Sequence, residues 1–285
     1  MDEIEWGRAT WTELAELGLG RHDPQAAPQD RLVTTAAGGP SAPPVVGLLP
    51  VGAVEAHGPH LAVLADVIIA TAAARASVAG LESLGFRGLV LPPVSYTPAG
   101  FAAGFPGTIS VRPSTVRALL NDIAESLEAQ GARAMVIVNA HLDPGHLEAL
   151  HGAAKGRDAP RGSREHPAMP ILFPDISRKP WALRLTDEFR SGACHGGRYE
   201  TSVVLAAAPD QVRERVMVQL PENPASLSDA IRSGLATFEE AGVDRAYCGA
   251  PAMATAAEGR GTIRILGEIV VDAVRDGLGT EVGES

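Results

Sequence analysis

The sequence predicts an α/β fold in which a parallel-rich sheet lies between helices on both of its faces. Two observations carry this prediction. Short, almost continuously apolar runs alternate along the chain with longer segments of helical spacing, as in parallel sheets whose strands are joined by crossover helices. The 285 residues are also 45% hydrophobic and 20% charged, which indicates a globular chain with a sizeable core. Because no internal repeat and no convincing linker divides the chain, we expect one domain over residues 1–285.

The first half of the chain begins with a short helix from Thr10 to Leu17, for which Thr10 is a suitable N-cap. Residues 20–44 are rich in Gly, Pro, Ala and Thr, and we interpret them as an inserted surface loop. The apolar run "VVGLLPVGAVE" at residues 45–55 predicts a buried parallel strand. Asp66 to Leu84 is rich in Ala and has helical spacing, and "RGLVLPPV" at residues 87–94 predicts the next strand.

The second half begins with the clearest helix of the chain, from Ser114 to Gln130, with Ser114 at the N-cap and Gly131 as the stop. Its predicted apolar face consists of Val116, Leu119, Leu120, Ile123 and Leu127. The later elements are strands at "AMVIVN" (134–139) and "MPILFP" (169–174), helices over 145–155, 200–208 and 260–277, and a long loop over 160–170.

Charge and cysteine content exclude several classes of protein. The chain has 24 basic and 34 acidic residues, a formal charge of −10, and no basic tract, so we expect neither a nucleic-acid partner nor a membrane-surface helix. Two cysteines make neither a disulfide scaffold nor a four-thiolate zinc site. The first ten residues, "MDEIEWGRAT", lack a signal-peptide pattern, and no apolar run is long enough to span a bilayer. We therefore expect a cytoplasmic protein.

Polar side chains follow two of the predicted strands at the point where each strand ends. Glu55 and His57 come after the first strand, and His141 and Asp143 come after the strand at 134–139. The carboxyl ends of parallel strands meet at one edge of a sheet, which is where ligands gather in such folds. In extended backbone, residues i and i+2 project to the same face. Each pair can thus present an imidazole nitrogen and a carboxylate oxygen together.

Asp66, at the start of the next helix, could serve as its N-cap or could bridge two metal ions. Imidazole and carboxylate ligands together suit Zn, Mn or Fe(II). Glu55, Asp66 and Asp143 supply three negative charges, which two divalent cations and one hydroxide would balance. A two-metal site of this kind generates a nucleophile near neutral pH. The alternative is that each histidine is a structural residue satisfied by hydrogen bonds.

A third cluster, "CHGGRYET", spans Cys194 to Thr201. His195 is a candidate proton shuttle because the ordinary pKa of histidine lies near neutrality, and Glu200 stands where a helix opens. The alternative is a turn histidine beside a helix-capping glutamate. A Cys194–His195 dyad is disfavoured because adjacent residues in extended backbone point to opposite faces. We expect His60 to lie behind the metal ligands and to hold one carboxylate by a hydrogen bond.

Five segments together resemble the creatininase family, in the order of that family and over roughly residues 45–275. They are "PVGAVEAHGPHLAVLAD" (50–66), "FPGTISV" (105–111), "VIVNAHLD" (136–143), "HGGRYETS" (195–202) and "GAPAMATAAEGRG" (249–261). The resemblance implies a three-layer α/β/α sandwich, a dinuclear metal site and hydrolysis of an amide-type C–N bond. It also implies assembly as a homo-oligomer, in many members a hexamer.

The resemblance further implies roles for individual residues. Glu55, Asp66 and His141 would hold one metal ion, and His57, Asp66 and Asp143 the other, with Asp66 bridging. His195 would be the catalytic acid–base residue, and Glu200 would support it or the site.

Two departures from the family pattern concern the substrate. Asp143 stands where creatininase has a glutamate, one methylene longer. Ala99, Phe101 and Ala102 occupy places where the family often carries Ser-x-Glu-His, so we expect an apolar wall there, with Tyr96 and Phe101 near the substrate. A creatinine substrate is not supported by this pattern.

The sequence thus predicts a metal-dependent hydrolase, with two divalent ions (Zn, Mn or Fe), that cleaves a small cyclic or linear amide by metal-bound hydroxide. A non-peptide amide is the first expectation, and a peptidase or deformylase of the same family is the alternative. The hypothesis from another class is a non-catalytic, metal-stabilised binding protein.

Overall fold

The computed structural model describes residues 5–20, 42–156, 168–193 and 195–280. Four parallel strands form one sheet in the order β2-β1-β3-β4. Their bounds are β1 Val45–Val51, β2 Arg87–Val90, β3 Ala134–Asn139 and β4 Ile171–Leu172. The predicted parallel α/β sheet is therefore confirmed, although the strand expected over 169–174 keeps only two residues.

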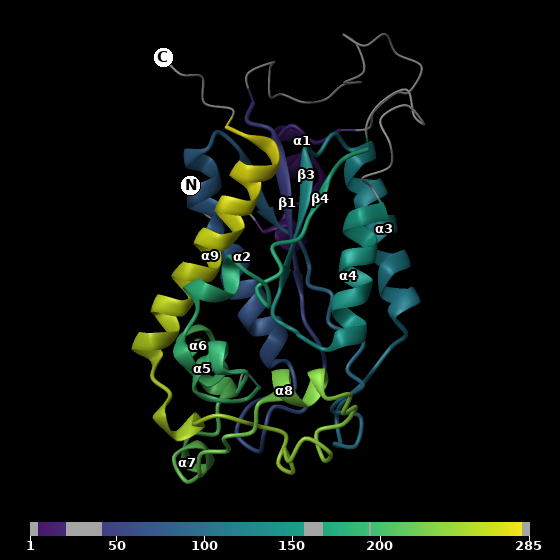
Figure 1. Cartoon of the computed structure of the whole chain (residues 1–285). Coiled ribbons are helices and arrows are strands. Elements are labelled where there is room, and N and C mark those ends of the chain that lie inside the picture. Colours follow the sequence, from purple (N-terminus) through teal and green to yellow (C-terminus); the bar gives the residue numbers. More distant parts are fainter. Residues whose placement is uncertain (1–4, 21–41, 157–167, 194, 281–285) are drawn as a thin grey trace.

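Helices cover both faces of this sheet, which makes the fold a three-layer α/β/α sandwich (Figure 1). One outer layer contains α2 Ala65–Ser83, α6 Arg198–Ala207 and α9 Ala256–Leu278. The other contains α3 Pro113–Ala129 and α4 Pro144–Gly156. A strand covered on both faces has no side that tolerates polar residues, and β1 is accordingly buried at every position.

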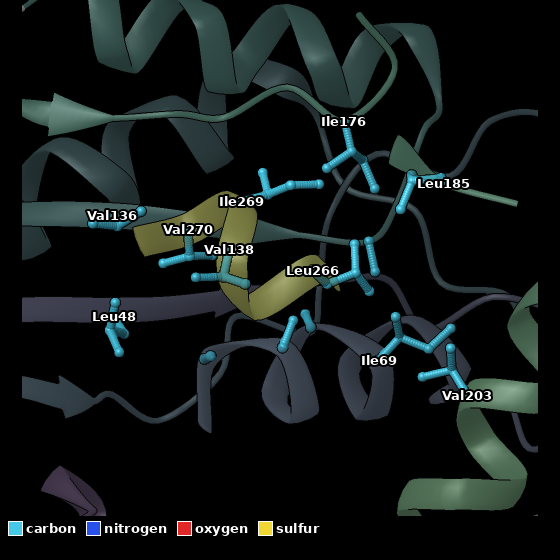
Figure 2. Close-up of a cluster of buried hydrophobic side chains, with 14 of the residues drawn as sticks. Leu48, Ile69, Val136, Val138, Ile176, Leu185, Val203, Leu266, Ile269 and Val270 are labelled. Atoms are coloured by element: carbon cyan, nitrogen blue, oxygen red, sulfur yellow. The ribbon is translucent and has the colours of Figure 1, made fainter. Parts of the chain in front are cut away.

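Alternate residues of β1 enter the two halves of the core. Val46 and Leu48 pack with α2 and α9 in one cluster, part of which is drawn in Figure 2. Val45, Leu49 and Val51 pack with α3 and α4 in the other. This alternation follows from the two-residue period of strand side chains.

The ends of two helices differ in detail from their predicted ends. Thr10 caps α1 (Trp11–Glu16) through a capping box with Glu13, as predicted. Ser114 as the N-cap of α3 is wrong, because the helix begins one residue earlier, at Pro113, which is favoured in a first turn. Leu119 is also 42% exposed, since the buried stripe runs through Val116, Leu120, Ala124 and Leu127.

Short elements surround the carboxyl ends of the strands, where α5 and α8 lie in Figure 1. A third apolar cluster, which includes Ala102, Leu227 and Phe238, packs among them. The loops expected over 20–44 and 160–170 fall mostly outside the described residues. None of the described helices is long and apolar enough to cross a membrane. The remaining elements are η1 Trp6–Arg8, η2 Trp181–Arg184, α5 Asp187–Ser191, η3 Pro209–Gln211, α7 Glu214–Met217, α8 Leu227–Arg232 and η4 Pro251–Met253.

The contact between α6 and α9 depends on Gly259, where any Cβ atom would overlap the carbonyl oxygen of Ser202. Substitution Gly259→Ala should therefore lower the free energy of unfolding by about 2–3 kcal/mol, as overpacking of a core contact does. The matched control is Gly261→Ala in the same helix, where a Cβ atom meets nothing within 4 Å. That change should raise stability by about 0.5–1 kcal/mol because Ala favours the helix. Urea denaturation of both variants tests the packing, and equal stabilities would contradict it.

Candidate metal centre

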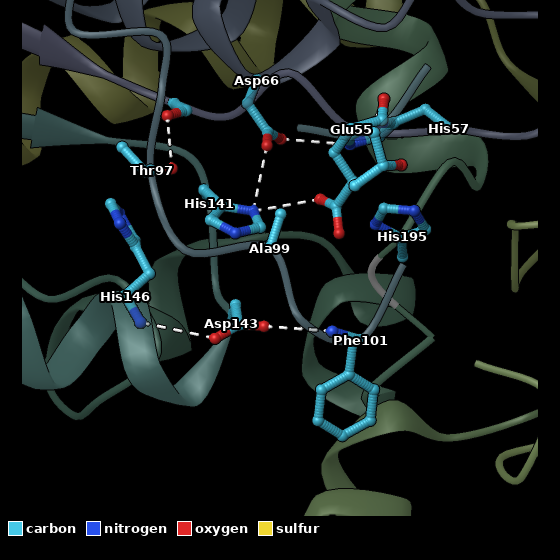
Figure 3. A network of polar contacts seen from close by, with 12 residues as sticks. Glu55, His57, Asp66, Thr97, Ala99, Phe101, His141, Asp143, His146 and His195 are labelled. Carbon is cyan, nitrogen blue, oxygen red and sulfur yellow. Dashed lines mark hydrogen bonds and ion pairs between the residues drawn. The ribbon is translucent and has the colours of Figure 1, made fainter. Parts of the chain in front are cut away.

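Five buried polar side chains meet at the carboxyl edge of β1 and β3, and all of them except Glu200 are labelled in Figure 3. The two strands are neighbours, and their last residues, Val51 and Asn139, lie side by side in register. The chain leaving β1 reaches two of the five residues, and the chain leaving β3 reaches a third. The other two stand in the first turns of α2 and α6. The five are Glu55, His57, Asp66, His141 and Glu200.

The first group of donors consists of Glu55, Asp66 and His141. His141 donates its Nε2–H to the carbonyl oxygen of Pro98 at 2.7 Å, so its Nδ1 atom carries a lone pair when the ring is neutral. That Nδ1 lies 3.1 Å from Glu55 Oε2 and 3.0 Å from Asp66 Oδ2. Apart from His141, neither of these two buried oxygens has a hydrogen-bond donor. When the His141 ring is neutral, three lone pairs therefore converge on one point, an arrangement that favours a metal cation there.

The second group consists of His57, Asp66 and Glu200. His57 donates its Nδ1–H to the carbonyl oxygen of Glu55, which leaves Nε2 to face Asp66 Oδ1 at 3.1 Å and Glu200 Oε2 at 3.6 Å. The two oxygens of Asp66 thus belong to different groups. This is the geometry of a bridging carboxylate, and each histidine is oriented by a backbone carbonyl, as metal-ligating histidines are.

Asp66 is not the N-cap of α2, which was the alternative prediction for this residue. The N-cap position is Leu64, and no side chain caps the helix there. Both carboxylate oxygens of Asp66 face histidine nitrogens instead of backbone amides. The prediction that Asp66 is a helix N-cap is therefore wrong.

Asp143 joins none of the donor groups in the described part of the chain. Its carboxylate accepts hydrogen bonds from the backbone amides of Phe101 at 3.3 Å and of Gly145 at 2.8 Å. These bonds hold it at the start of α4, facing Phe101 in Figure 3. Glu200 takes the position in the second group that the resemblance gave to Asp143, because the first turn of α6 brings its longer side chain to His57.

His195 lies beside the donors and completes a third group with Glu55 and His57. It donates its Nε2–H to the carbonyl oxygen of Ala56 at 2.8 Å, which leaves Nδ1 as the acceptor nitrogen. Its ring lies 4.1 Å from that of His57 and 4.5 Å from that of Phe238, centroid to centroid. Cys194, the other half of the dyad considered above, lies outside the described residues.

The pKa values follow from burial and from these charges. Burial alone lowers the pKa of His57, but the carboxylates of Asp66 and Glu200 outweigh it and raise that pKa to about 10. Burial raises the pKa of Glu200 to about 8, although the charge on His57 opposes this shift. Burial and the charge on His57 lower the pKa of His195 to about 4, so that ring is neutral at pH 7.

Four of the residues expected behind the ligands or near the substrate lie elsewhere. His60 is fully buried, but its Nε2 atom lies 2.8 Å from the Thr201 hydroxyl and does not hold a carboxylate. Ala99 and Ala102 are fully buried and do not line the cavity, so only Phe101 of the expected apolar wall faces it. Tyr96 is 57% exposed and also lies outside the cavity lining.

A cavity of about 1030 Å³ opens onto the donor groups. Its floor includes Glu55, Asp66, His141, His195 and Glu200, and its walls come from α4, from the segment after β4, and from α5 and α8. Phe238 and the residues of α8 were not expected from the sequence. They stand in a region without strong periodicity, and only the folded chain brings them over the site.

The comparison with protein families decides what kind of protein carries this centre. Residues 37–274 match the family model described as "Creatininase: Creatinine amidohydrolase". The chain belongs to the creatininase family. A mycofactocin precursor peptide peptidase of Mycolicibacterium smegmatis is 35% identical over 231 residues, which cover 78% of this chain and 80% of that protein.

Other members of the family are also similar over most of their length. A mycofactocin precursor peptide peptidase of Mycobacterium tuberculosis is 34% identical, covering 83% of this chain and 85% of that one. A creatinine amidohydrolase of Pseudomonas putida is 28% identical, covering 83% and 88%. A solved structure described as "Creatininase Mn" superposes with a TM-score of 0.64 at 22% identity and covers 97% of this chain and 99% of its own. A Zn-Zn type mutant creatininase gives 0.66 at 23%, with the same coverage. These structural likenesses confirm the fold.

The donor geometry predicts different consequences for two aspartates. Substitution Asp66→Asn should strongly reduce the metal content of the purified protein, because it removes the carboxylate that both groups share. The matched change Asp143→Asn should leave the metal content unchanged, since the Asp143 carboxylate is bonded to backbone amides. Elemental analysis of the purified variants measures this. If the Asp143→Asn variant loses metal, Asp143 is a metal ligand, as the family resemblance implies.

Metal binding should also release protons. With raised pKa values, His57 and Glu200 are mostly protonated at pH 7 in the metal-free chain, whereas a bound metal needs both deprotonated. Affinity for Zn²⁺ should therefore rise as the pH is raised from about 6 to about 8. Calorimetric titration in buffers of different ionisation enthalpy counts the released protons. Affinity that is flat over this range would contradict the pKa shifts.

Proposed function

We propose that this protein is a metal-dependent hydrolase of an amide C–N bond, that its two divalent ions are shared by Asp66, and that its substrate is a peptide or peptide-like amide. The observation that carries the proposal is the placement of the two Asp66 oxygens. Each faces a different histidine, and each histidine is accompanied by a second carboxylate, Glu55 or Glu200. The imidazole and carboxylate donors suit Zn, Mn or Fe(II).

Bound at these groups, two divalent ions would supply Lewis acidity toward a carbonyl oxygen and would activate water near neutral pH. The chain itself supplies the proton chemistry. His195 is neutral, lines the cavity, and has its tautomer fixed by the bond from Nε2–H to Ala56, so Nδ1 is the atom that accepts a proton. From there the proton can pass to the leaving amine nitrogen, as in general acid–base catalysis.

The size of the cavity favours a peptide over a small cyclic amide. Its volume of about 1030 Å³ lies at the upper end of the range for drug-sized ligands, far more than a single small ring fills. Phe101 and Phe238 form apolar parts of its wall, which suits hydrophobic side chains. Two of the relatives described above are peptide peptidases, and their similarity to this chain exceeds that of the creatinine amidohydrolase.

The test is a substrate panel with the metal-loaded protein. Peptides, lactams and formamides are incubated with protein reconstituted with Zn²⁺, Mn²⁺ or Fe²⁺, and the products are identified by mass spectrometry. We expect cleavage of peptides that is lost on chelation. Substitution His195→Ala should reduce kcat by about 10²–10⁴ while both ions stay bound, because it removes proton transfer and no ligand of the two main groups.

The control for this variant is Tyr96→Phe, whose side chain lies outside the cavity lining and whose change should leave kcat unaltered. Full activity in metal-free protein would contradict a metal-dependent reaction. Two bound ions with no cleavage of any member of the panel would favour a metal-stabilised binding protein instead.

A further inference from the structure

The outer walls of the cavity carry a concentration of positive charge. Among the described residues that line it, beyond the donor groups and Asp143, five are basic and one, Glu148, is acidic. The chain as a whole has the opposite balance, with 24 basic against 34 acidic residues. The basic residues come from four separate segments, so no single helix face accounts for them. We call them the cationic wall: Lys155, Arg178, Lys179, Arg190 and Arg232.

Ion pairs within the protein leave most of this charge available. Arg190 and Arg232 pair with Asp187 and Asp229, whose side chains are 93% and 69% exposed, and such exposed pairs contribute little. Neither aspartate lines the cavity. Lys179 is exposed and, among the described residues, forms no ion pair.

A buried carboxylate holds one part of the wall in place. Asp175, which is 5% exposed, accepts hydrogen bonds from His151 Nε2–H at 2.8 Å and from the Ser177 amide at 2.9 Å. It also pairs with Arg178 Nε at 3.0 Å. His151, Ser177 and Arg178 all line the cavity, whereas Asp175 itself does not. Because Asp175 engages Nε, the terminal guanidinium nitrogens of Arg178 can still bind a planar anion.

We propose that the cationic wall binds carboxylates of the substrate, so that the preferred substrate is an acidic peptide segment. This inference rests on the proposed function for one point, that an amide bond of the bound peptide is cleaved. Binding of the acidic segment to the cationic wall does not depend on it. Carboxylates suit the wall because arginine guanidinium groups pair with them in a planar, two-point manner and lysines add charge without strict geometry. The apolar residues between the basic ones, such as Leu183 and Ile231, contact the stems of the peptide side chains.

The test measures binding and cleavage separately on the metal-loaded protein. The first probe is acetyl-Ala-Val-Ala-Glu-Glu with a free terminal carboxylate. The second, acetyl-Glu-Glu-Ala-Val-Ala-amide, places the two glutamates at the other end of the peptide. The neutral probe is acetyl-Ala-Val-Ala-Gln-Gln-amide. Calorimetry gives Kd for probes that stay intact, and KM replaces it for probes that mass spectrometry shows to be cleaved. We expect at least one acidic probe to bind about tenfold more tightly than the neutral one, with a preference that falls as salt is raised.

The variant is the double substitution Arg178→Gln and Lys179→Gln, which should reduce the acidic preference to about twofold or less. Lys179→Gln alone disturbs no bond within the described protein and serves if the double variant fails to fold. The control, Arg215→Gln, removes one exposed positive charge outside the cavity and should keep the full preference. Equal binding of acidic and neutral probes, or an unchanged preference in both wall variants, would overturn the inference. Tight acidic binding without cleavage of the probes would support the wall, and the proposed function would then be contradicted if no member of the substrate panel were cleaved either.

Discussion

The site depends on the carboxylate of Asp66, which lies between His57 and His141 with one oxygen toward each. A carboxylate buried in this way is costly unless cations face it. Here the two histidines oppose the effect of burial and hold the pKa of Asp66 well below its usual range. In the metal-free chain, protons on the histidines balance the charge. The same positions are suited to divalent ions, so one arrangement serves folding and metal binding alike.

Backbone carbonyl groups hold the three histidine rings of the site in their orientations. His57, His141 and His195 each donate one ring N–H to a carbonyl oxygen, of Glu55, Pro98 and Ala56 respectively. Those carbonyls lie in the segments that follow β1 and β2, next to the strand ends that the sheet holds side by side. The fold therefore orients every histidine ring at the centre and decides which ring nitrogen faces the carboxylates.

The carboxylate of Glu188 fixes the position of the segment that carries His195 and Glu200. Glu188 accepts hydrogen bonds from the amides of Tyr199 and Ala250, both at 2.8 Å, and so ties the start of α6 to the chain that precedes α9. Gly197 and Gly249 leave room for that carboxylate, since a Cβ atom at either would collide with it. The first turn of α6 is thereby fixed where Glu200 reaches His57.

The sequence by itself determined the strands, the approximate bounds of the long helices and the place of Glu55 and His141 past two strand ends, because these depend on short-range patterns. An apolar run specifies a buried strand, and residues just past its end must lie at the sheet edge, as Glu55 and His141 do. Tertiary structure decided the rest. Glu200 rather than Asp143 faces His57, and His60 meets Thr201 instead of a carboxylate. The cationic wall also joins four segments remote in sequence. Such contacts depend on how separate elements pack and on which of several nearby donors each carboxylate binds. No local sequence pattern determines either.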